Sequence, residues 1–305
     1  MLIVGTTTHL EDLDRSYTFA LDVYVTALSA NPTAQSLVGS APGICVLLDG
    51  ERIDRVDDVD LAPLVSLSTT GAQSMATTAT GDMLVGLVGA HLVTVSLAGV
   101  ISPVASFDSV TGRDTWQNPA GSELELRSIA VTTDDRWFVT VHVGGVWRSD
   151  DQGRSWRNVL PPETDVHEIV TGPNGRVAVA AAVGLGWSND NGNTWQWTTE
   201  GLHAPYARAV ALDGDAAYVT ASTGPETTDG RLYRCTLGST LEPCGTGGGL
   251  PGSFPFNLDS GSVTANSGQV ALGTHDGYVF HSRDGGSNWE RIAEGMQPVR
   301  ILRYV

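Results

Sequence analysis

Three arginines and a histidine stand at equivalent points of a repeated pattern, and together their side chains could bind an anion. They are Arg127, His167, Arg208 and Arg300. The planar guanidinium fork of arginine matches carboxylate and phosphate groups. If the repeats bring these side chains together, they form a ring for an anionic small molecule or glycan. Alternatively, each arginine pairs with a neighbouring acid and links adjacent repeats. The sequence favours this alternative, because its 34 acidic residues outnumber the cationic residues two to one.

Histidines and acids form a second set of reactive side chains. His142 and His275 each stand seven residues before the serine of a motif described below, and His9 and His91 fall near similar strand ends. Four histidines on one rim could bind a metal or move protons. Equivalent positions of separate repeats lie far apart, however, so we expect no metal and no cofactor. A hydrolase could recruit a carboxyl pair, which the spacing does not identify, from Glu163, Asp165, Glu226, Asp229 and Asp276.

Short strands must position these residues, because helical periodicity is nearly absent. Alternating or β-branched runs are separated by Gly, Asp and Asn, which is typical of an all-β protein. A strand–turn–strand repeat, with its second strand ten residues after the anchor residue, begins at Gln73, Arg127, His167, Arg208 and Ser260. A sixth copy is split between residues 300–305 and 1–5. The six anchors are 40 to 54 residues apart, the size of a four-stranded blade.

One eight-residue motif occurs three times, at 149–156, 188–195 and 282–289. Its glycine provides a backbone position that other residues would strain, and its Asp and Ser/Thr side chains can bond the amides of the same turn. The tryptophan can pack beneath the turn. We therefore predict a structural hairpin turn, which lacks the ligand spacing of a calcium loop. The motif residues are Ser149, Asp151, Gly153, Ser155, Trp156, Ser188, Asp190, Gly192, Thr194, Trp195, Ser282, Asp284, Gly286, Asn288 and Trp289.

This motif resembles the Asp-box (BNR) repeat of sialidase-like β-propellers. Two copies match fully, and Asn288 replaces Ser/Thr in the third. The resemblance implies that each box caps the two outer strands of a blade, on the face opposite the ligand site. It also places Arg127, His167, Arg208 and Arg300 near the mouth of a central tunnel. We predict one domain, 1–305, folded as a six-bladed β-propeller of four-stranded antiparallel blades, with the ring closed by pairing of the N- and C-terminal strands.

The remaining outer hairpins lack the box and fall at 43–50, 91–95 and 232–235. Residues 9–42 are predicted to form one long insertion in the closing blade. It begins with acidic residues and contains an apolar run, 17–28, that fits a strand or a helix. A loop of this length is more often a contact surface than an idle connection.

Composition narrows the function. All 17 cationic residues are arginines, and the net charge is −17. Such an acidic, lysine-free surface stays hydrated in strong salt, so we expect a halophilic cytoplasm and no binding to nucleic acid. No apolar stretch is long enough to insert into a membrane, and no leader is evident. Three cysteines, Cys45, Cys235 and Cys244, do not indicate a disulfide framework, although the last two could face each other across a hairpin.

The resemblance leaves two functions open. Sialidases have an arginine triad, a Tyr–Glu nucleophile pair, an acid Asp and an Arg-Ile-Pro motif. Arg-Ile-Pro is absent before the first blade, and we find no convincing Tyr–Glu pair. Non-catalytic Asp-box propellers hold other proteins on their faces. The favoured function is therefore a non-catalytic platform for another protein. The alternative is a sialidase-like glycosidase or other hydrolase that acts on an anionic substrate at the tunnel mouth.

Overall fold

The computed structural model describes residues 2–6, 9–12, 17–20, 27–31, 36–41, 44–49, 52–57, 72–96, 100–118, 121 and 123–304. Up to residue 72 it describes side chains only for Leu2, Val4 and Thr6. The chain divides into two compact units, 23–169 and the combination of 1–22 with 170–304.

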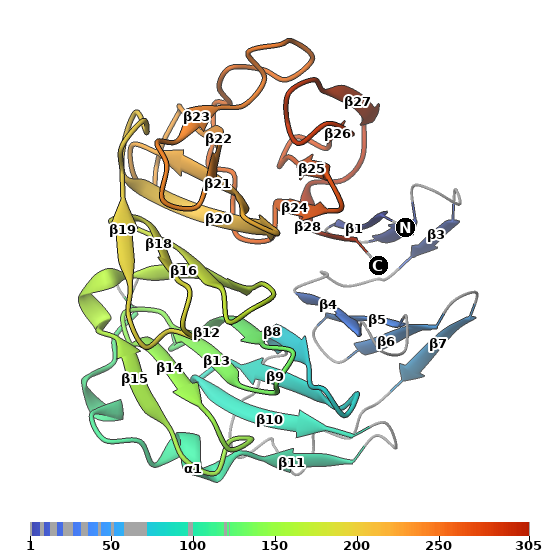
Figure 1. Cartoon of the computed structure of the whole chain (residues 1–305). Coiled ribbons are helices and arrows are strands. Elements are labelled where there is room, and N and C mark those ends of the chain that lie inside the picture. Colours follow the sequence, from blue (N-terminus) through green and yellow to red (C-terminus); the bar gives the residue numbers. More distant parts are fainter. Residues whose placement is uncertain are drawn as a thin grey trace. The chain divides into compact units, whose positions relative to one another are not determined.

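Three four-stranded antiparallel sheets make up the unit 23–169, in the orders β4-β5-β6-β7, β11-β10-β9-β8 and β12-β13-β14-β15 (Figure 1). The strands are β4 (Ala27–Asn31), β5 (Ser36–Ala41), β6 (Ile44–Asp49), β7 (Arg52–Asp57), β8 (Ala72–Thr77), β9 (Met83–Leu87), β10 (His91–Val95), β11 (Ile101–Pro103), β12 (Leu126–Val131), β13 (Trp137–Val141), β14 (Gly145–Ser149) and β15 (Arg157–Leu160). Short helices are α1 (Ala105–Asp108), η2 (Arg113–Thr115) and η3 (Pro162–Thr164).

The unit of 1–22 and 170–304 holds the sheets β28-β1-β2-β3, β20-β21-β22-β23 and β24-β25-β26-β27, and most of the sheet β16-β17-β18-β19. The strands are β1 (Leu2–Thr6), β2 (His9–Asp12), β3 (Tyr17–Ala20), β16 (Val166–Thr171), β17 (Val177–Ala181), β18 (Gly184–Ser188), β19 (Gln196–Thr198), β20 (Tyr206–Asp213), β21 (Ala216–Ser222), β22 (Arg231–Thr236), β23 (Glu242–Pro243), β24 (Val263–Asn266), β25 (Gln269–Gly273), β26 (Val279–Ser282), β27 (Glu290–Ala293) and β28 (Val299–Tyr304).

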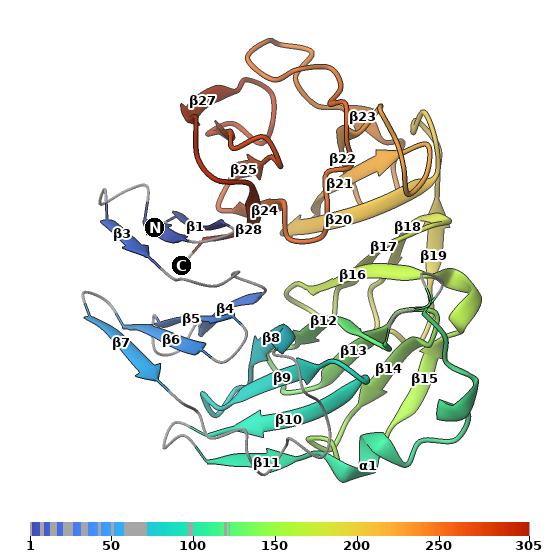
Figure 2. The ribbon, with the colours of Figure 1, turned by 180° about the vertical axis from the view of Figure 1, so that it is seen from behind.

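The predicted strand repeat is confirmed in five sheets. The second strands β9, β13, β17, β21 and β25 begin at or within two residues of the predicted positions. The sixth, split copy is also found, because β28 pairs with β1 and places Leu302 opposite Val4. Both views show the two strands side by side (Figures 1 and 2). The constant ten-residue step from each anchor to its second strand therefore predicted which strands pair.

The described strands between 9 and 57 differ from the prediction of six sheets with one insertion at 9–42. Within the described ranges the strands form seven four-stranded sheets. Strands β2 and β3 complete the sheet of β28 and β1, whereas β4 to β7 form a further sheet. The hairpin predicted at 43–50 belongs to this additional sheet, and the apolar run 17–28 contains β3 and the start of β4. The sequence does not predict the additional sheet, because this sheet has neither a copy of the eight-residue motif nor an anchor that fits the repeat.

The three motif copies adopt the predicted turn. In the first copy, the backbone N–H of Gly153 donates to Ser149 Oγ at 2.8 Å, and Ser149 Oγ donates to Asp151 Oδ1 at 2.8 Å. Gly153 has a φ of 81°, in the left-handed region that favours glycine. Asn288 substitutes for Ser/Thr in the third copy, since its Nδ2 donates to Asp284 Oδ2 at 2.7 Å. The turn therefore depends on a donor at this position rather than on a hydroxyl.

These turns predict an acid-sensitive stability. The pKa values of Asp151, Asp190 and Asp284 are lowered to about 2, chiefly because the residue four positions further on donates hydrogen bonds to each carboxylate. An unfolded Asp has a pKa of about 3.9. The stabilisation is present above that value and is lost as the pH falls toward 2. We expect the thermal midpoint to decline between about pH 4 and 2, and to decline less in Asp190→Asn. A thermal midpoint that stays constant across this pH window, measured by circular dichroism, would contradict the prediction.

The core lies between the sheets of each unit. Every residue of β9, β13 and β17 is buried, as required of strands covered on both faces. In the unit 23–169, Phe107 and Trp116 from the α1–η2 segment pack with Trp147 of β14. In the other unit, Cys235 and Cys244 are free, and burial raises the pKa of their thiols to about 11 and about 12. None of the helices in the described ranges is long and apolar enough to span a membrane.

Candidate functional site

Arg208 on β20 binds an acid of its own unit. Its Nε lies 2.8 Å from Asp259 Oδ1, in the connection that leads to β24. Ser260 follows in the same connection and donates from Oγ to the carbonyl of Arg208 at 3.0 Å. Asp259 and Ser260 thus hold both the side chain and the backbone of Arg208. Arg208 links two sheets in the way that the alternative to an anion site predicts.

Arg127 and His167 also meet an acid, within the unit 23–169. Asp165 follows η3 and adopts a left-handed φ of 44°. Its carboxylate lies 3.6 Å from Nε2 of the fully buried His167 and 3.8 Å from Nε2 of His142. The pKa of Asp165 is lowered, first by the polar contact with His167 and then by the charges of His167, His142 and Arg127. A carboxylate of the chain thus already lies beside these side chains.

Arg300 differs from the other anchors, because its side chain is exposed on β28 and the structure gives it no ion pair in the described parts of the chain. Arg208 and Arg300 belong to one unit, and Arg127 and His167 belong to the other. A single ring formed by all four residues therefore stays a prediction.

The remaining histidines have separate neighbours. His91 Nδ1 lies 2.9 Å from Asp108 of α1, and His203 is 2.8 Å from the hydroxyl of Tyr233. His275 is exposed beside Phe256. Among the side chains that the structure describes, no three of His, Cys, Asp or Glu gather as metal ligands. The side chain of His9 lies outside the described set.

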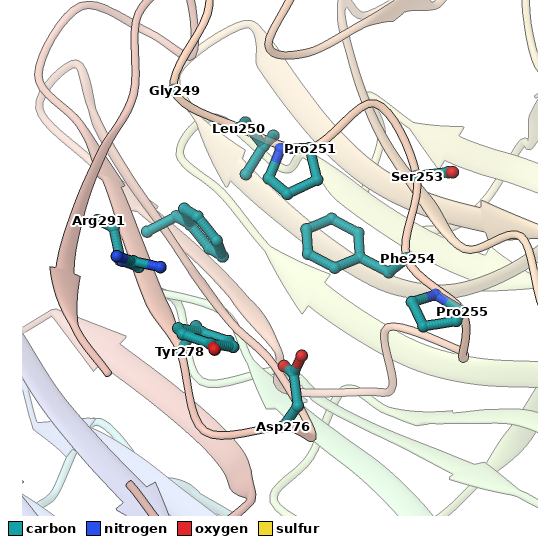
Figure 3. A pocket seen from close by; sticks show the side chains of 10 residues that line it. Gly249, Leu250, Pro251, Ser253, Phe254, Pro255, Asp276, Tyr278 and Arg291 are labelled. Atoms are coloured by element: carbon teal, nitrogen blue, oxygen red, sulfur yellow. The ribbon is translucent and has the colours of Figure 1, made fainter. Parts of the chain in front are cut away.

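A pocket of about 550 Å³ lies in the unit of 1–22 and 170–304, on one face of the sheet β24-β25-β26-β27 (Figure 3). Arg291 of β27 pairs in register with Phe280 of β26, so both side chains reach the same face. Tyr278, two residues before Phe280, shares this face because strand side chains alternate. Gly249–Pro255, from the connection between β23 and β24, supplies most of the other wall.

Aromatic contacts fix the pocket wall. Phe254 is buried and packs edge to face on Phe280, with ring centroids 6.0 Å apart. Its backbone is also held, since the N–H of Phe254 donates to the carbonyl of Gly230 at 2.8 Å. The Arg291 guanidinium lies 5.3 Å from the centroid of Tyr278 and pairs with Glu294 at 2.9 Å. The pocket is open to solvent, and its lining combines apolar rings with a few polar groups that could contact a ligand.

Only part of this pocket could be predicted from the amino-acid sequence. Asp276 was among the candidate acids, and Tyr278 and Phe280 belong to a predicted outer strand. Phe254 and Arg291 were missed. Their signal was the connection 244–262, which is rich in Gly and Pro and longer than most connections.

Comparison with known proteins establishes the fold. No known protein-family profile matches the chain, and no curated protein sequence matches it. A solved protein from Lactobacillus plantarum superposes with a TM-score of 0.63 at 12% identity, covering 100% of this chain and 98% of that one. The WD40 repeats of RRP9 give a TM-score of 0.58 at 12% identity, covering 92% and 83%. The Dos1 propeller gives 0.53 at 11%, covering 94% and 72%. These similarities show a β-propeller fold.

Proposed function

We propose that this chain is a non-catalytic platform that binds another protein. In this proposal it is an Asp-box β-propeller of the sialidase-like type, with a ring closed by the pairing of β28 and β1. The three boxed turns and that strand pair support the architecture. The observation that carries the function is the aromatic pocket on the sheet β24-β25-β26-β27, because it offers apolar surface and anchoring groups for a ligand.

The acids beside the arginines favour a platform over a hydrolase for anionic substrates. A substrate carboxylate would have to compete with Asp259 for Arg208, and with Asp165 for the field of Arg127. We retain Arg127, Arg208 and Arg300 as proposed contacts with the partner. In that role, arginine contributes through partly apolar contacts as well as through charge. His167 is fully buried, so its proposed role is to hold Asp165 near Arg127.

Affinity purification at the native salt concentration tests this function. The wild-type protein is compared with Tyr278→Ser and with Val183→Ser, which removes an exposed apolar side chain that does not line the pocket. We expect a protein that is retained by the wild type and Val183→Ser and lost with Tyr278→Ser. Identical sets of captured proteins would overturn the role of the pocket. Turnover of a sialoside or uronide that disappears in Arg208→Gln would favour the hydrolase instead.

We further propose that the chain works in a halophilic, high-salt cytoplasm. The support is a net charge of −17 with no lysine. Like charges repel one another in the compact state, and salt weakens this repulsion. Raising KCl from about 0.2 to about 2 M, which shortens the Debye length several-fold, is expected to raise the thermal midpoint of the chain. An unchanged or lower midpoint in a melting series would contradict the proposal.

A further inference from the structure

The two ends of the pocket differ in chemistry. Leu250 and Pro251 lie at one end and Asp276 lies at the other, with Phe254 and Tyr278 between them (Figure 3). Leu250 and Phe254 are buried, whereas Pro251 and Asp276 are exposed. A ligand that fills the pocket would therefore place an apolar group at the Leu250 end and a polar group at the Asp276 end.

Charge at the pocket indicates the sign of that polar group. The positive charge of Arg291 is offset by Glu294, which lies 2.9 Å away. Asp276 accepts a hydrogen bond from the hydroxyl of Thr274, and within the described chain it has no cationic partner. The two charged residues of the lining, Asp276 and Arg291, cancel in sum, but the pairing of Arg291 with Glu294 leaves Asp276 as the acid without an ion pair at its end of the pocket, among the described residues. A lysine or arginine side chain complements this end, because its stem is apolar and its head is cationic.

The strand beside the pocket favours an extended ligand. β27 is the last strand in its sheet, so among the described strands it has no second neighbour. Three of its four residues are exposed, and Ile292 is an exposed large apolar side chain. An extended peptide can add to such an edge through main-chain hydrogen bonds, while alternate side chains enter pockets on one face. Side chains two residues apart match the spacing between Phe280 of β26 and Tyr278, which directly precedes that strand.

We propose that the pocket binds an extended segment of a protein partner that carries an apolar side chain and, two residues away, a lysine or arginine. The apolar side chain lies at the Leu250 end, against Phe254 and Phe280, and the cation lies beside Asp276. The backbone of the segment pairs with the free edge of β27. This inference rests on the proposed binding function and specifies the chemistry of the partner.

Selection of phage-displayed random heptapeptides against the wild-type protein tests this chemistry. Enriched sequences are then synthesised with a fluorescein label, and their affinities are measured by fluorescence polarisation. We expect the enriched peptides to share an apolar residue and a basic residue two positions apart. Replacing the apolar residue by Ser should weaken binding roughly 10- to 100-fold, as expected for losing the burial of one large apolar side chain.

Two matched variants locate the cation. Asp276→Asn removes the charge but keeps an acceptor for the Thr274 hydroxyl, so the turn is preserved. This variant should bind the basic peptides with an affinity about threefold to fivefold lower, as expected for the loss of one exposed charge contact. Glu242→Gln removes an equal charge from an exposed position on β23, outside the pocket, and should leave their affinity unchanged. Thermal midpoints confirm that both variants are folded.

The outcomes separate the peptide inference from the platform function. Enriched peptides without a basic residue, equal affinity for Asp276→Asn and the wild type, or no enrichment over Tyr278→Ser would overturn the peptide inference. If affinity purification still finds a partner that depends on Tyr278, the platform function stands without it. If both experiments fail, the pocket has neither role.

Discussion

Leu302→Ala is expected to lower the free energy of unfolding by about 2–5 kcal/mol, the usual cost of a large cavity in a core. Leu302 is fully buried on β28, in a cluster with Leu2, Val4 and Ala271. It also lies opposite Val4 in the pair of strands from the two chain ends. Truncation of its side chain therefore removes packing from both β28 and its neighbouring sheet. Urea unfolding of the purified chain measures the loss.

Arg300→Ala is the matched control on the same strand. Its side chain is exposed, so we expect a change within about 0.5 kcal/mol. Equal losses in Arg300→Ala and Leu302→Ala would show that β28 is not packed as described. A small loss in both would show that the pairing of β28 with β1 contributes little to stability. The control has a second use, because Arg300→Ala in the affinity purification tests this residue as a partner contact.

The repeat made much of the fold predictable. Each repeat has an anchor residue followed ten residues later by a second hydrophobic strand, and this step can be located without an alignment. Five sheets and the β28–β1 pair follow from it. The sheet β4-β5-β6-β7 lacks both features that mark a repeat, which are the eight-residue turn motif and the anchor residue. Its strands alternate as ordinary strands do, but nothing in the spacing shows where one sheet ends and the next begins.

The candidate site was less predictable, because it depends on contacts between repeats. Spacing placed Arg208 at an anchor, but its partner Asp259 lies in the connection to the next sheet. The position of that acid is set by the path of the loop, which has no period. The pocket has the same origin. Tyr278 and Phe280 follow from strand alternation, whereas Phe254 reaches them only because the backbone of its loop bonds to Gly230.

Trp289→Ala is expected to lower the free energy of unfolding by about 3–5 kcal/mol, the range for removing a buried large aromatic side chain. Trp289 is the last residue of the third motif turn (282–289), where its Nε1 donates to the carbonyl of Gly286 at 3.0 Å. It is 7% exposed and packs in the same core cluster as Leu250, Phe254 and Phe280. The boxed turn therefore supports the pocket wall through the core. Binding of the selected peptides should weaken in Trp289→Ala, even though Trp289 does not line the pocket.

Trp195→Ala, at the same position of the second motif copy (188–195), should lower the free energy of unfolding by less. Trp195 is only partly buried, and among the described residues its Nε1 has no hydrogen-bond partner. The two tryptophans thus share a motif position but differ in packing. Chemical unfolding of the two variants measures the difference. Equal losses in the free energy of unfolding would mean that the tryptophan stabilises the chain through the turn itself in both copies. A larger loss for Trp289→Ala, together with weaker peptide binding, would show that its stabilising effect comes from the core beneath the pocket.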